Sequence, residues 1–157
     1  EGEVHEMAVV DWPTTRRVGQ MELLTKRDAY TVVHEVFEAT NEVGDAPVGW
    51  SEGRVESLTI QLGKWIPELI ALKNTDLLAE TLDAIVLLGG DLENPQVALG
   101  MGALLTQQQS NGAFGDYEEA RALLASEGLP YDVDVGQYLH TTEVALWLFD
   151  LLYGPID

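Results

Sequence analysis

His140 and Glu143 are the residues whose types and spacing come closest to a catalytic pair. Side chains three residues apart on a helix project toward one side, and a histidine beside a carboxylate can act as a general acid or base near neutral pH. His140 also heads an apolar stripe that includes Trp147, so the alternative is a core histidine bonded to a carbonyl group. The pair could also bind a metal ion with help from Asp132 or Asp134, although no third ligand is marked by spacing.

A second histidine, His34, stands one helical turn after Tyr30 in an equally apolar segment. The two histidines would converge if their two helices line one cavity; otherwise they are two unrelated structural histidines. We therefore take His140, Glu143 and His34 as candidate catalytic residues. Tyr30 and Trp147 are candidates for contact with a ligand.

The composition excludes several other chemistries. The 157-residue chain has no cysteine, which rules out disulfides, thiolate metal sites and a cysteine nucleophile. Its 8 basic and 27 acidic residues give a formal charge of -19, so we expect neither nucleic acid nor an anionic membrane as a partner. A cationic partner, or an acidic surface that serves only solubility, fits better. The sequence has no nucleophile elbow, phosphate-binding glycine loop or HExxH motif, and it indicates no cofactor.

Hydropathy and helical periodicity predict an all-α protein. No apolar run is long enough to span a bilayer and no signal peptide precedes the fold, so we expect a cytoplasmic protein. Residues 1–20 have no clear period and are expected to form an N-terminal arm, with 21–157 as a single helical domain. Short connections favour pairing of the helices into three αα-hairpins. The six expected helices cover roughly residues 22–41, 52–72, 76–88, 95–109, 116–127 and 135–153.

Local signals mark several helix ends and irregularities. Ser51 can cap the second helix, and Asn94-Pro95 is an N-cap followed by proline at the first helical position. Pro67 predicts a kink or break in the second helix. Gly100 and Gly102 each cost about 1 kcal/mol inside a helix, so we expect close packing against a neighbour to compensate.

The stretch LLTQQQSNGAFG predicts a helix end, a tight turn and an aromatic residue that packs back. Gln108 would bond the turn backbone, and Gly112 would adopt a positive φ. This pattern resembles the glutamine–tryptophan repeat of the α/α toroids of terpenoid cyclases and protein prenyltransferases, with Phe114 where that family usually has tryptophan. The later segment YLHTTEVALWLF resembles the inner helix of such repeats. The resemblance covers about residues 99–153.

The resemblance implies a repeat scaffold rather than an activity. Three hairpins make at most half of a six-hairpin ring, the Asp-rich motif of the cyclases is missing, and the prenyltransferase zinc site needs a cysteine. In the toroids, the loops on the side of the glycine turn border the central pocket. By that likeness Phe114, Asp116, Tyr117, Asp132 and Tyr138 are further candidates for ligand contact. Asp116 is also explained as a helix cap, and Tyr117 as packing on a helix end.

Two functional hypotheses follow. The first is a small acidic helical protein with an apolar pocket that binds or converts a hydrophobic small molecule, as in secondary metabolism, by histidine and carboxylate acid–base chemistry. The second is a noncatalytic protein–protein interaction module or a homodimeric structural domain, whose acidic face or exposed inner helices meet another chain. They differ in whether His140 is needed for function.

Overall fold

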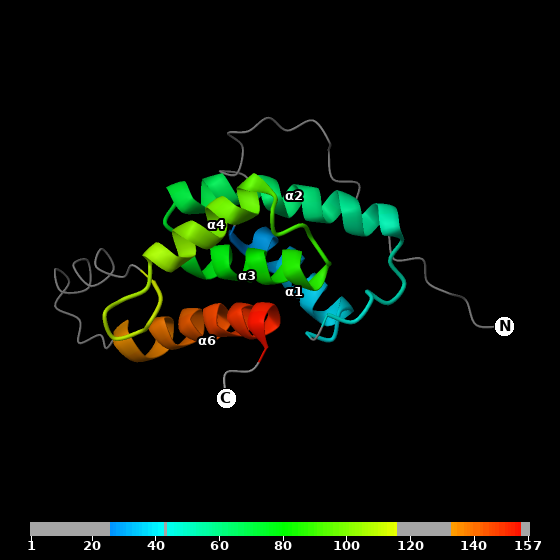
Figure 1. Ribbon diagram of the computed structural model, residues 1–157. Helices are drawn as coiled ribbons and strands as arrows, with labels where there is room; N and C mark the ends of the chain where they lie inside the picture. The colour runs from blue at the N-terminus through cyan, green and yellow to red at the C-terminus, as the bar shows by residue number, and fades with distance from the viewer. Residues whose placement is uncertain (1–25, 43, 116–132, 155–157) are drawn as a thin grey trace.

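Over the part that the structure describes, the chain is helical. The computed structural model describes residues 26–154, except residue 43 and residues 116–132. These residues form five helices and no strand, with one isolated bridge between Gln108 and Phe114. The predicted all-α class is therefore confirmed. The helices are α1 (Lys26–Ala39), α2 (Glu52–Ala71), α3 (Thr75–Leu87), α4 (Pro95–Thr106) and α6 (Val133–Tyr153) (Figure 1).

Two predicted segments lie outside the described residues. One is the helix expected after Asp116, and the other is the N-terminal arm of residues 1–20. The count of six helices therefore stays a prediction.

The helix ends follow local signals closely. The Ser51 side chain accepts a hydrogen bond from the backbone N–H of Arg54, and Asn94 caps α4 in front of Pro95. Helix α3 begins one residue earlier than predicted, because the side chain of Asn74 accepts from the N–H of Leu77 and so takes the capping position. Short polar side chains at the N-cap satisfy amides that have no partner inside the helix.

Helix α2 continues through Pro67 as far as Ala71, so of the predicted kink or break, the break does not occur. A proline inside a helix costs about 3 kcal/mol. Buried residues on both sides of Pro67, among them Ile66 and Leu69, hold the two parts of the helix on the same core. Their burial outweighs the loss of one backbone hydrogen bond.

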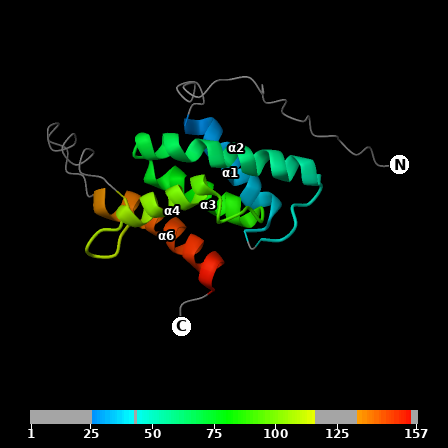
Figure 2. The same ribbon diagram turned by 45° about the horizontal axis from the view of Figure 1, so that its top comes forward.

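Helix α3 is the centre of the described fold. It contacts α1, α2, α4 and α6, and only Asp76 and Val86 along its length escape full burial. Figures 1 and 2 show α3 between α2 and α6. Helix α1 packs on α3 through Val33, Val36 and their neighbours, rather than forming the predicted hairpin with α2. Helix α3, whose residues are apolar on most sides, lies in the middle, where the neighbouring helices cover those sides.

The turn after α4 docks that helix onto α6. Gly112 has a φ of +90°, and the Gln108 side chain lies 3.5 Å from the Gly112 carbonyl oxygen. Phe114 is only 1% exposed and its ring lies 5.9 Å from that of Phe149. The backbone N–H of Phe114 donates to the hydroxyl of Thr142. This local geometry agrees with the predicted turn, whereas the toroid arrangement of the whole chain stays a prediction.

None of the described helices is long and apolar enough to cross a membrane.

The two glycines of α4 differ in their surroundings, which gives a direct test of the packing. A Cβ atom on Gly100 would lie 2.9 Å from Ile66 Cγ2 and 3.1 Å from Leu82 Cδ2, both in the core, whereas a Cβ on Gly102 would meet nothing within 4 Å. We expect Gly100→Ala to lower the free energy of unfolding by about 1 kcal/mol, because overpacking outweighs the gain in helix propensity. Gly102→Ala, as the matched control, should raise it by up to about 1 kcal/mol. Urea unfolding followed by circular dichroism measures both, and equal effects would contradict the close packing at Gly100.

Candidate functional site

One face of α3 carries three carboxylates. Asp76, Glu80 and Asp83 are spaced four and three residues apart, which places them in line along the helix. Glu80 is 1% exposed and Asp83 is fully buried. Carboxylates are rarely buried to this extent unless they are paired or bind a cation. Their position on the central helix therefore needs an explanation beyond solubility.

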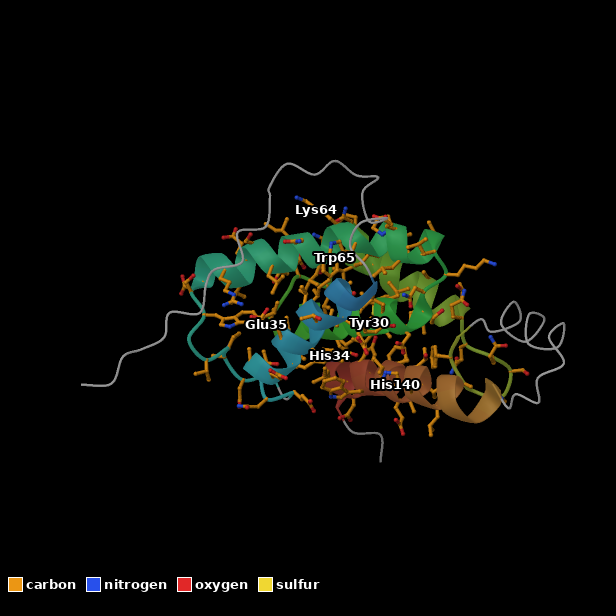
Figure 3. The ribbon with its side chains drawn as sticks, turned by 180° about the vertical axis from the view of Figure 1, so that it is seen from behind. Tyr30, His34, Glu35, Lys64, Trp65 and His140 are labelled. Carbon is orange, nitrogen blue, oxygen red and sulfur yellow. The ribbon has the colours of Figure 1, made fainter. Side chains whose placement is uncertain are left out.

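Two histidines from different helices approach the same oxygen of Glu80. The Nε2 atom of His34, on α1, lies 3.7 Å from Glu80 Oε1, and that of His140, on α6, lies 3.5 Å from it. His140 Nε2 is also 3.7 Å from Asp76 Oδ1. Figure 3 shows His34 and His140 reaching this region from the two helices on either side. Both histidine side chains are 58% exposed, so the site is open on the histidine side and closed on the Glu80 side.

Two hydroxyl groups orient Asp76. Tyr30 donates to Asp76 Oδ2 at 2.6 Å, and Thr141 donates to Asp76 Oδ1 at 3.0 Å. Burial, followed by the hydrogen bond to Asp76, raises the pKa of Tyr30, so the phenol keeps its proton and remains a donor. Asp76 is thereby held from α1 and α6 with one oxygen directed at His140.

Three oxygens of the two deeper carboxylates lack hydrogen-bond partners. Glu80 Oε2 and both carboxylate oxygens of Asp83 have none among the described residues. Burial raises the pKa of Glu80 to about 7, the charge of Asp76 adds to the rise, and His140 lowers it in part. Burial, with the nearby charge of Glu80, raises the pKa of Asp83 to about 9. Asp83 is therefore protonated at neutral pH, and Glu80 titrates there.

The structure brings together three of the residues predicted from sequence. His34, His140 and Tyr30 all lie at the α3 carboxylates. Glu143 does not join them: it is exposed on α6, and the carboxylates beside His140 come from α3 instead. A spacing of three on one helix places two side chains on the same side, but it does not decide which of them faces the neighbouring helix.

The predicted ligand contacts are dispersed. Phe114 belongs to the core, and Trp147 is half-buried with its ring 5.2 Å from that of Phe37. The remaining predicted contacts lie outside the described residues or, for Tyr138 on α6, have a side chain outside them; they are Asp116, Tyr117, Asp132 and Tyr138.

Sequence reasoning missed Asp76, Glu80, Asp83 and Thr141. The signal was present in the segment TDLLAETLDAIVL, whose acidic residues recur on one face although the helix is apolar on most other sides. A helix without a polar face for solvent must bury its acidic residues, and buried carboxylates gather at functional sites.

Comparison with protein-family models finds a match over most of the chain. A family described as "Domain of unknown function (DUF6895)" matches residues 16–148. The chain belongs to the DUF6895 family. No curated protein and no solved structure matches it. The DUF6895 match spans Tyr30, His34, Asp76, Glu80 and His140, so the whole candidate site lies within the family domain.

The buried Asp83 makes the stability of this DUF6895 protein depend on pH. Its pKa is 3.8 in ordinary surroundings and about 9 in the fold, so between these values the folded state holds a proton that the unfolded chain has lost. The stability that depends on this proton is fully present below about pH 4 and falls as pH rises toward 9. Asp83→Asn removes this dependence, because the amide stays neutral.

We expect the melting temperature of Asp83→Asn to exceed that of the unmodified protein at pH 8.5, with the difference shrinking toward pH 5. Calorimetry of metal-free protein across this range measures it. Asp150→Asn, on the exposed face of α6, is the control for loss of one charge. A variant that loses stability most strongly at pH 8.5 would show that Asp83 is ionised and paired.

Proposed function

We propose that the protein binds a divalent transition-metal ion between α3 and the histidines of α1 and α6. The observation that carries the proposal is the spacing of the histidine and carboxylate atoms, 3.5 and 3.7 Å. An N–H···O hydrogen bond is about 2.7–3.2 Å long. Two ligands of one ion, each roughly 2.0–2.2 Å from it, lie roughly 3.0–3.6 Å apart. The 3.5 Å distance between His140 and Glu80 falls within the second range, and the 3.7 Å distance between His140 and Asp76 lies just above it.

Three ligand atoms are close enough for a single ion. One oxygen each of Asp76 and Glu80 and one nitrogen of His140 lie within 4.8 Å of one another. His34 is within 3.7 Å of Glu80, and its half-exposed ring can turn toward the ion as a fourth ligand. Imidazole together with carboxylate suits Zn²⁺, Mn²⁺, Fe²⁺ or Co²⁺, whereas Ca²⁺ and Mg²⁺ prefer oxygen ligands alone.

The surroundings of the ligands support the same proposal. Hydrogen bonds from Tyr30 and Thr141 fix Asp76, as residues around metal ligands commonly do. Glu80 has one oxygen without a partner and is closed off from water, so a cation beside it would offset the penalty of its burial. A metal ion would also favour the ionised form of Glu80, whose pKa is otherwise about 7.

The open side of the site suits chemistry on a small molecule. Both histidines are half-exposed, so an ion held by three or four protein ligands could keep a position for water or substrate on that side. When bound, such an ion would polarise a substrate oxygen or lower the pKa of water. Trp147 is half-buried and packs on Phe37, whose ring lies 5.8 Å from that of His34, so an apolar side chain that a hydrophobic substrate could contact is partly exposed near the site.

Metal-free proton transfer is the second candidate function. The observation that favours it is the pKa of Glu80, raised to about 7, beside two histidines. Groups that titrate close to the working pH are the most effective general acids and bases. This candidate retains the acid–base chemistry expected from the sequence but replaces Glu143 with Glu80.

Metal affinity tests the first candidate. We expect Zn²⁺ and Mn²⁺ to bind the chelator-treated protein with a stoichiometry of about one, measured by isothermal titration calorimetry. His140→Ala and Glu80→Gln should each weaken binding at least tenfold, and Tyr30→Phe about tenfold, because even residues that only orient a ligand contribute about 10–100-fold. Glu143→Gln is the matched control and should bind as tightly as the unmodified protein. Absence of binding, or equal losses in all four variants, would overturn the metal site.

The protons released on metal binding separate the two candidates. Because Glu80 titrates at about pH 7 and histidine must be neutral to ligate, binding at pH 6.5 should release about one proton or more, and affinity should rise toward pH 8. Titrations in buffers of different ionisation enthalpy give the number released. The Glu80→Gln variant should release about half as many protons as the unmodified protein. A protein that binds no metal, but whose Glu80 titrates near pH 7 by NMR, would support proton transfer instead.

A further inference from the structure

A groove lies at the end of α3 remote from Asp76. Three segments line it: the loop that joins α1 to α2, the first turns of α2, and the residues that follow α3. Its apolar side chains include Pro47, Trp50, Val55 and Leu88. The lining contains none of the residues of the candidate metal site, so the groove is a separate feature.

The charged residues that line this groove are all acidic. They are Glu52, Glu56 and Asp91, and no lysine or arginine lines it. The groove adjoins both the carboxyl end of α3 and the amino end of α2, so the two helix dipoles act there with opposite signs. The three carboxylates therefore favour a positively charged ligand and repel an anionic one.

One basic residue, Arg54, lies beside the wall of the groove and is already paired. The guanidinium of Arg54 lies over the Trp50 ring, 3.9 Å from its centroid, and also pairs with Glu35. Arg54 does not line the groove. The lining therefore has three acidic residues and no basic residue. Trp50 itself is half-buried and forms part of the groove wall.

We propose that this groove binds a small organic cation with an apolar body, such as an alkylammonium compound. The apolar side chains would cover the hydrocarbon part, and the carboxylates would hold the ammonium group by charge. The proposal does not depend on the metal site, since the two regions share no residue.

The first experiment compares three probes of equal chain length: hexylammonium, hexan-1-ol and hexanoate. The indole N–H signal of Trp50, assigned with Trp50→Phe, is followed by NMR during each titration at pH 7. We expect hexylammonium to bind at least fivefold more tightly than hexan-1-ol, and hexanoate not to bind. Equal binding of amine and alcohol, or no shift of the Trp50 signal with the amine, would overturn the proposal.

A charge variant provides the second arm. Glu52→Gln/Glu56→Gln should weaken hexylammonium binding at least fivefold. Glu143→Gln/Asp150→Asn removes the same number of charges from the exposed face of α6 and should leave binding unchanged. Equal weakening in both variants would show attraction to the net charge of -19 rather than a site. Nα-acetyl-lysine methylamide is tested alongside, and tighter binding of this compound than of hexylammonium would assign the groove to a protein lysine and overturn the small-molecule proposal.

Discussion

The rest of the described structure depends on one constraint. Ionisable carboxylates are buried on α3, the helix that every other described helix contacts. Moving a carboxylate out of water is costly unless a proton, a hydrogen-bond donor or a cation accompanies it. Asp76 has two donors, Glu80 has two nearby histidines, and Asp83 has neither and keeps its proton. The three residues thus show three different solutions along one face of α3. Helices α1 and α6 supply the first two, so the apolar packing of both helices on α3 also brings the partners of Asp76 and Glu80 into place.

The same constraint supports the proposed functional role of these carboxylates. An apolar residue at Asp83 would pack in the core without a proton or a partner, and such replacements are commonly neutral or stabilising. Carboxylates whose pKa is this strongly raised by burial are found most often at functional sites. Its neighbour Glu80 lies between the closed interior and the two half-exposed histidines. A charge bound on the histidine side would therefore alter the protonation of Glu80, and the charge of Glu80 in turn affects the pKa of Asp83.

Local features of this protein could be read from sequence, and long-range ones could not. Ser51, Asn94 and the Gly112 turn act within a few residues of themselves, so their roles follow from neighbouring letters. His34 and His140 were visible as candidates, but their meeting at Glu80 depends on α3 lying between α1 and α6, which no periodicity reports. Glu143 was preferred because its spacing from His140 is local. The acidic residues of α3 do not stand out in the sequence. Acidic residues on a helix are normally assigned to its solvent-exposed face, and α3 has no such face.

Two adjacent threonines of α6 make contacts in different directions. Thr141 donates to Asp76 on α3, and Thr142 accepts from the backbone of Phe114 in the turn after α4. Neighbouring residues on a helix point about 100° apart. Only one rotation of α6 about its own axis satisfies both contacts, and that rotation places His140 beside Asp76 and Glu80. The Gln108–Phe114 turn therefore helps to fix the rotation of α6. A segment with no ionisable group thus sets the angle at which the His140 imidazole faces Asp76 and Glu80.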